Sequence, residues 1–189
     1  MIALGRAALA VLLFALAGCG SEAAPAAPPA GDGRHGAALP QAPRDVRPLS
    51  ADPCAAITAA QLRALGFEPA GERVTLPTGE ASCEWRGPAG SPYTNVGVAT
   101  ARDILVDTYR VRQFSIFRPT TIDDLPAVVE QTNATSISCN VTVGTAQNQG
   151  FLVIYDGTFK PDGQPNDPCG QAQQIAQRVV AALPMLPAK

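Results

Sequence analysis

The sequence predicts a small α+β domain, in which N-terminal and C-terminal helices pack on one face of a small antiparallel β-sheet and two disulfides hold them there. Three observations predict this fold. Residues 136–143 alternate between polar and apolar side chains, as a half-buried strand does. Residues 169–183 place apolar side chains at steps of three and four, the period of an amphipathic helix. Four cysteines fall in this part of the chain: Cys54, Cys83, Cys139 and Cys169.

The first helical segment begins near Asp52-Pro53-Cys54, where Asp52 offers an N-cap and proline occupies the first helical position. Residues 58–61 then match a capping box, in which a Thr side chain and a Gln side chain satisfy each other's backbone N–H groups. We therefore expect one turn, a break, and a helix to Leu65, ended by Gly66.

The next segment alternates at strand period over residues 81–86, and again over residues 95–99. The turn-rich residues 87–92 lie between them, so the two strands are expected to form a hairpin with a long loop. Trp85 has the same strand phase as Cys83 and is expected in the core. A second capping-box pattern at residues 100–103 favours a helix that continues to Arg112.

The second half predicts three more strands and a final helix. Residues 125–131 form a short strand whose Pro126 suits an edge or a strand start. Residues 147–150 are a plausible turn after the alternating strand, and residues 151–155 are apolar on both faces, as in a central strand. Asp167-Pro168-Cys169 repeats the N-cap and proline pattern, and Pro184 ends the helix.

The N-terminus predicts export and lipid anchoring. Arg6 precedes an uninterrupted apolar run from Ala7 to Leu16, which suits a signal peptide and is too short to span a bilayer. Residues 16–19 read Leu-Ala-Gly-Cys and resemble the lipobox of bacterial lipoprotein precursors. The resemblance implies a signal peptide over residues 1–18 and a lipidated Cys19 on the extracytoplasmic face of the cell membrane.

Composition separates a tether from a folded domain. In residues 20–49, 18 of the 30 residues are Ala, Pro or Gly. A segment with so few large apolar side chains cannot bury enough surface to offset the conformational entropy lost on folding. Residues 19–49 are therefore expected to be a disordered tether, and residues 50–189 the folded domain. The whole chain has a formal net charge of −2 and no basic run. Binding to nucleic acid needs clustered cations and is disfavoured.

An even number of cysteines outside the cytoplasm indicates disulfides. Cys83 and Cys139 share the phase of inward apolar neighbours, while Cys54 and Cys169 each follow Asp-Pro at a helix start. If each disulfide joins a helix start to the strand beneath it, the favoured pairs are Cys54–Cys83 and Cys139–Cys169. The rival pairing, Cys54–Cys169 with Cys83–Cys139, needs the two helix starts to be adjacent.

Most catalytic arrangements are absent from the sequence. The single histidine, His35, lies in the expected tether, which removes Ser-His-Asp and Cys-His mechanisms from the domain. There is no phosphate-binding loop, nucleophile elbow or dinucleotide turn, so no cofactor is expected. Asp123 and Asp124 read as a solvated turn. The acidic loop 156–167 fails the calcium-loop pattern, so no metal site is expected. Residues 113–117 read as a core-packing connector, or else as the lip of a cleft.

The five patterns Asp-Pro-Cys, Cys-Glu-Trp, Leu-Pro-Ala-Val, a cysteine in a valine-alternating strand and a second Asp-Pro-Cys together resemble a family of actinobacterial lipoproteins that carry a secreted domain of unknown function. They begin at Asp52, Cys83, Leu125, Cys139 and Asp167. The resemblance implies the topology and the cysteine framework but no chemistry.

These observations favour a non-enzymatic binding or accessory domain, anchored at the cell envelope through Cys19, whose ligand is a small molecule, a glycan or a membrane protein. One alternative is a carboxylate-dependent hydrolase of cell-wall polymer, which needs two acidic side chains in one cleft. Another is a sensor or partner module of a membrane protein, which needs an exposed apolar patch.

Overall fold

The computed structural model describes residues 33–187, which fold around one seven-stranded sheet with the order β1-β2-β3-β7-β6-β5-β4. Every pair of neighbouring strands is antiparallel. The strands are β1 (Glu72–Thr75), β2 (Ala81–Arg86), β3 (Tyr93–Ala99), β4 (Ile116–Ile122), β5 (Leu125–Gln131), β6 (Ser138–Ala146) and β7 (Gln149–Asp156). The fold is therefore α+β, as the sequence predicts.

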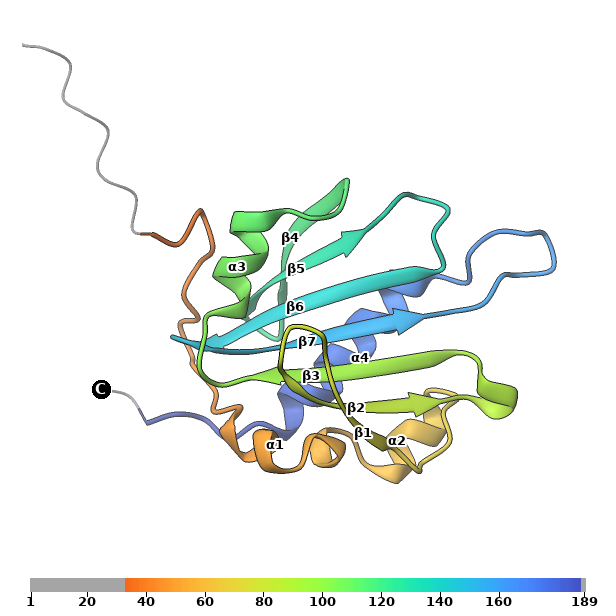
Figure 1. The fold of residues 1–189 in the computed structure, drawn as a ribbon, viewed down its shortest axis with the longest axis horizontal. Helices are drawn as coiled ribbons and strands as arrows, with labels where there is room; N and C mark the ends of the chain where they lie inside the picture. Colours follow the sequence, from red (N-terminus) through yellow and green to blue (C-terminus); the bar gives the residue numbers. More distant parts are fainter. Residues whose placement is uncertain (1–32, 188–189) are drawn as a thin grey trace, which may run out of the picture. The chain divides into compact units, whose positions relative to one another are not determined.

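The helices cover the two faces of the sheet unequally (Figure 1). One face packs against the N-terminal and C-terminal helices, and the other carries α3 beside the turn that joins β1 to β2. The helices are α1 (Arg47–Ala51), η1 (Pro53–Ala56), α2 (Ala59–Ala64), η2 (Pro88–Gly90), α3 (Ile104–Val111) and α4 (Pro168–Ala182).

The main core lies between α4 and the centre of the sheet. Ile175, Val179 and Val180 of α4 are fully buried against apolar side chains of the strands, among them Val141 and Val153. Asp167 accepts a hydrogen bond from the N–H of Gly170, and Pro168 occupies the first turn, as the sequence pattern predicts. The strand β7 lies at the centre of the sheet, which accounts for its apolar character on both faces.

Two disulfides attach helix starts to strands, and they are the predicted pairs. Cys54 of η1 bonds to Cys83 of β2, and Cys139 of β6 bonds to Cys169 of α4. Cys83 and Cys139 both point to the helix-covered face, as their strand phase predicts, and each bonds to the helix start that packs over it. Trp85, in the same phase as Cys83, is 1% exposed and belongs to the main core.

The boundary between tether and domain lies earlier than the composition suggests. Ala37, Val46 and Leu49 are buried, although all three fall inside the expected tether. The N–H of Arg44 donates to the carbonyl of Thr145, and the N–H of Leu186 donates to that of Pro43. A few buried apolar side chains and backbone hydrogen bonds are enough to order this segment. The average composition of the segment does not reveal them. Residues 1–32 lie outside the described residues.

Three local expectations were wrong. Asp52 does not cap η1; its side chain forms an ion pair with Arg73 of β1 instead, with 2.8 Å between the charged atoms. The helix after β3 is capped by Asp103 rather than Thr100 and begins at Ile104. The strands β1 and β4 were not predicted, because their exposed edge positions carry polar residues that break the alternation. The edge strand is β4, so β5 is an inner strand; Pro126 nevertheless lies at the start of β5, before its pairing with β6 begins, and a strand start was one of the two places expected for this proline.

Each disulfide is expected to stabilise the domain by restricting the unfolded chain. The paired cysteines are 29 and 30 residues apart, so each bridge should contribute about 3 to 4 kcal/mol. We expect Cys139→Ala/Cys169→Ala to lower the free energy of unfolding by that amount in urea titrations. The pair Cys54→Ala/Cys83→Ala should lose a similar amount, because its loop is equally long. A double variant as stable as the wild type would contradict this account.

Candidate functional site

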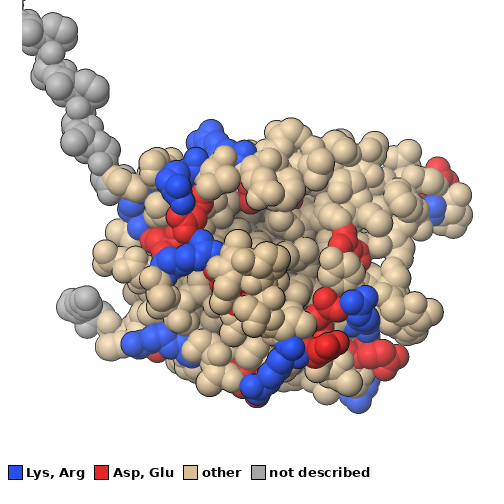
Figure 2. All heavy atoms as spheres, viewed as in Figure 1, with Lys and Arg blue, Asp and Glu red and all other residues tan. Residues whose placement is uncertain are grey.

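A pocket of about 170 Å³ lies on the face of the sheet that α3 only partly covers. Figure 2 shows this face hollowed between α3 and the turn that joins β1 to β2. Polar and apolar side chains both line the pocket: Thr78, Arg102, Ile104, Asp107, Thr108, Val111, Gln113, Glu130, Asn140, Thr142 and Leu152. We call it the Glu130 pocket.

The register of three adjacent strands builds the floor of the pocket. Glu130 of β5 lies directly opposite Asn140 of β6, and Thr142 of β6 lies opposite Leu152 of β7. Directly opposite side chains on one face are about 5 Å apart at Cβ. Two neighbouring rows of the sheet therefore bring a carboxyl, an amide, a hydroxyl and an apolar side chain together.

Glu130 is the unusual member of this floor. The residue is 6% exposed, and its Oε1 atom has no hydrogen-bond partner among residues 33–187. Burial raises the pKa of Glu130 to about 7, and no neighbouring cation opposes the rise. An unpaired buried polar group costs stability. The fold therefore holds a carboxyl with unused hydrogen-bonding capacity beside an open pocket.

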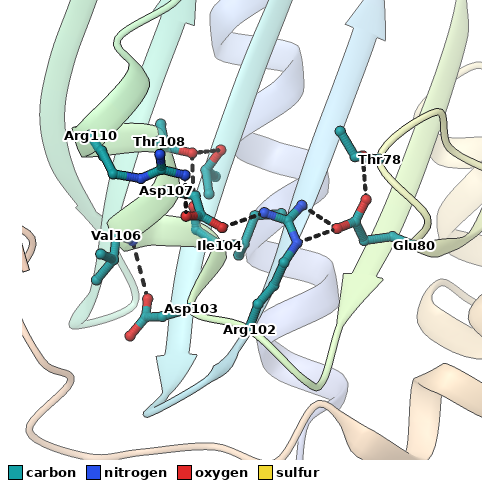
Figure 3. A network of polar contacts seen from close by, with 10 residues as sticks. Thr78, Glu80, Arg102, Asp103, Ile104, Val106, Asp107, Thr108 and Arg110 are labelled. Carbon is teal, nitrogen blue, oxygen red and sulfur yellow. Dashed lines mark hydrogen bonds and ion pairs between the residues drawn. The ribbon is translucent and has the colours of Figure 1, made fainter.

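A network of ion pairs forms one wall of the pocket (Figure 3). Arg102, in the bend before α3, donates from Nε to Glu80 at 2.7 Å and from Nη1 to Asp107 at 2.6 Å. Arg110 donates to the other oxygen of Asp107 at 2.9 Å, and Thr78 donates to Glu80. The network thus links α3 to the β1–β2 turn on the opposite side of the pocket.

The two carboxyl groups of the pocket have opposite electrostatic surroundings. Burial acts to raise the pKa of Asp107, but hydrogen bonds from Arg110 and Arg102 outweigh it, and the pKa is lowered. Asp107 is therefore an ionised carboxylate with both oxygens occupied by guanidinium groups. Within the described part of the chain no guanidinium donates to Glu130, and burial raises its pKa to about 7.

The helix α3 is held in place at its start and from beneath. Asp103 accepts a hydrogen bond from the N–H of Val106, and Arg34 forms an ion pair with the same carboxylate at 2.7 Å. Leu105 is fully buried against Gly144 of β6, where a Cβ atom would lie 2.9 Å from the Leu105 Cδ2 atom. A glycine at this position lets α3 lie close to the sheet, and this sets the depth of the pocket.

The residues singled out from the sequence mostly serve the fold. Asp123 and Asp124 form the exposed two-residue turn between β4 and β5, both with positive φ, as expected of a solvated turn. The expected lipidation site, Cys19, lies outside the described residues. The four domain cysteines are bridged and lie at the helix-covered face, away from the Glu130 pocket.

Residues 113–117 match both readings that the sequence left open. Gln113 lines the pocket, as a cleft lip would. Phe117 packs edge-on against Tyr109 of α3 at 5.1 Å between ring centroids, as a core connector would. The segment joins α3 to β4, so it borders the pocket at one end and anchors α3 at the other.

The sequence reasoning missed Glu130 and Arg102. The available signal for Glu130 was a carboxylate inside the largely apolar strand Leu125–Gln131, which has no partner of opposite charge nearby in the sequence. Arg102 carried no such signal, because its partner Glu80 is separated from it by the whole β2–β3 hairpin.

Residues 33–187 contain neither a membrane-spanning helix nor a cluster of metal ligands. None of their helices is both long and apolar enough to cross a bilayer. Within the same residues, no group of three or more His, Cys, Asp and Glu side chains is arranged to hold a metal ion.

The raised pKa of Glu130 predicts a pH-dependent stability. Between about pH 4.5 and about pH 7 the folded protein keeps a proton on Glu130 that the unfolded chain loses, so stability falls as the pH rises. Glu130→Gln removes this titration and should be more stable than the wild type above pH 7, by up to about 3 kcal/mol.

Urea titrations at several pH values measure this difference, and Glu72→Gln on the exposed strand β1 is the matched control. The advantage of Glu130→Gln should grow through the interval and level off above about pH 7. An advantage that does not change with pH would show that the Glu130 pKa is ordinary.

Comparison with known proteins identifies the family without assigning an activity. No curated protein and no solved structure matches the chain. A family model described as a protein of unknown function, DUF3558, matches residues 14–182, which include every strand and helix of the described domain. The chain belongs to this family of unknown function, DUF3558.

Proposed function

We propose that this protein is a cell-envelope lipoprotein whose domain binds a small ligand in the Glu130 pocket without transforming it. The single observation that carries the binding role is the Oε1 atom of Glu130, which is buried beside the pocket and has no hydrogen-bond partner in the described residues. A strand position that leaves a carboxyl unpaired lowers stability. Strongly perturbed carboxyl groups in clefts are typical of functional sites, where a ligand supplies the missing partner.

The anchoring part of the proposal rests on the N-terminal sequence. The apolar run from Ala7 to Leu16 and the following Leu-Ala-Gly-Cys suit a cleaved lipoprotein signal. Two acyl chains on Cys19 would give stable attachment to the membrane. From Cys19 to Gly33 the extended chain spans at most about 50 Å.

The length of chain between Cys19 and Gly33 limits how far the pocket can lie from a membrane that holds Cys19. The first described residues reach α3, because Arg34 forms an ion pair with Asp103 at the helix start. The same helix borders the Glu130 pocket. A lipid on Cys19 would therefore hold the pocket within tens of Ångström of the bilayer surface, where a ligand from the envelope or from a neighbouring membrane protein is at hand.

A hydrolase of cell-wall polymer is the second candidate, because two carboxyl groups with opposite pKa shifts line one pocket. That pattern is typical of acid–base pairs in glycoside hydrolysis. Binding is favoured because Arg102 and Arg110 occupy both oxygens of Asp107. A nucleophile or general base needs a free oxygen, and Asp107 has both committed.

The anchoring proposal is tested with Cys19→Ala. The wild type should enter the detergent phase in a Triton X-114 separation, and intact mass spectrometry should find diacylglycerol on a chain that begins at Cys19. Cys19→Ala should lack that mass and remain uncleaved or be released. Wild-type protein without acyl mass, free in the medium, would refute the anchor.

The binding and hydrolase candidates are separated by turnover. Purified protein should release no reducing sugar or peptide from isolated cell wall, and Asp107→Asn should change nothing in this assay. Wall hydrolysis that is lost in both Asp107→Asn and Glu130→Gln, with folding intact by circular dichroism, would replace binding with catalysis.

A further inference from the structure

We propose that the Glu130 pocket binds a primary ammonium group on a short apolar chain, with the Glu130 carboxylate as its counter-ion. This inference rests on the proposed binding function and adds the chemical class of the ligand. It follows from three properties of the pocket, which are its free hydrogen-bonding groups, its charge and its size.

The free hydrogen-bonding groups favour a donor. Ionised Glu130 is an acceptor only, and its Oε1 atom has no donor in the described protein. Asn140 lies directly opposite Glu130 across the β5–β6 pair, and Thr142 is the next residue of β6 on the same face. An ammonium group has three N–H donors. One donor would reach the carboxylate, and the amide and hydroxyl oxygens beside it would accept the others.

The charge of the pocket favours a cation over an anion. Arg102 is the one cationic residue among those that line it, and it is held by Glu80 and Asp107 together. Arg110 is bound to Asp107, and Arg112 lies over the ring of Phe117 at 4.8 Å. The basic side chains on or beside α3 are therefore engaged, while Glu130 is not. A carboxylate or phosphate ligand would find no uncommitted guanidinium here and would face Glu130.

The size and the apolar lining of the pocket determine which group the ammonium is attached to. Ile104, Val111 and Leu152 line the pocket beside the polar groups. A cavity of about 150 Å³ accommodates benzene in other proteins, so about 170 Å³ suits a ligand of roughly six to eight heavy atoms. A short alkyl chain would cover the apolar residues while its ammonium end meets Glu130.

Ammonium binding is coupled to the proton on Glu130. Burial raises the pKa of this carboxyl to about 7, so below that pH a cation must displace a proton before it can pair. The other charged groups that line the pocket are Arg102 and Asp107, which neutralise each other and stay ionised near pH 7. Alkylammonium ions also stay protonated there. Affinity should therefore fall about tenfold from pH 8 to pH 6, and change little above pH 8.

The test uses full-length protein in detergent and three probes with the same chain, n-butylammonium, n-butanol and n-butyrate. Binding is followed by ¹H–¹⁵N NMR shifts of the Gln113, Asn140 and Thr142 amides. We expect saturable shifts with n-butylammonium, at least tenfold weaker binding in Glu130→Gln, and no change in Glu72→Gln. The apparent affinity should show the pH dependence given above.

The remaining outcomes separate the ligand class from the binding function. Stronger binding of n-butanol or n-butyrate at the same amides would overturn the ammonium class and leave the pocket as a binding site. If none of the three probes shifts these amides, the ammonium class also fails. Small molecules extracted from the cell envelope are then added to the same protein sample. If the extracted molecules shift these amides in the wild type but not in Glu130→Gln, the proposed binding function is retained. If they cause no such shifts, the binding function is overturned together with the ammonium class.

Discussion

The packing of α4 against the centre of the sheet is the interaction on which the rest of the structure depends. It buries one face of β6 and β7 completely, with Ile175, Val179 and Val180 inserted among the strand valines. The Cys139–Cys169 bridge fixes the start of the helix to β6. Because burial on this face stabilises the fold, the opposite face of the sheet can remain partly uncovered.

That other face is covered by a helix too short to seal it. The helix α3 packs on β5, β6 and β7 through Leu105 and the small residue Gly144, and the Glu130 pocket lies along the side of the helix, from Ile104 to Val111. The network from Glu80 through Arg102 to Asp107 then closes one side with charges that neutralise each other. A partly buried ion-pair network contributes little net stability, but it fixes the geometry of a wall.

Glu130 stands apart from this self-contained arrangement. Among the described residues, Glu130 Oε1 and Thr145 Oγ1 are the buried side-chain atoms without a hydrogen-bond partner, and of these only Glu130 is ionisable. Ser82 and Asn95, on the same face as Glu130, bond to each other across β2 and β3. The carboxyl of Glu130 has no such partner at Oε1, and no cation offsets the cost of its ionisation. A buried strand position normally carries an apolar or a hydrogen-bonded side chain, and Glu130 departs from that pattern at a cost in stability. Departures of this kind concentrate at functional positions.

The sequence alone determined the α+β class and the final helix, and it favoured the disulfide pairing that the structure has. These depend on local periodicity: the phase of Cys83 and Cys139 places them on the helix side, and Asp-Pro places Cys54 and Cys169 at helix starts. Only the tertiary structure decided that residues 33–49 join the domain, because isolated buried residues such as Val46 leave no periodic signal. The pocket was also decided there, since Glu130, Arg102 and Thr78 come from three distant segments. Strand register and helix docking bring them together, and no spacing within the chain encodes that meeting.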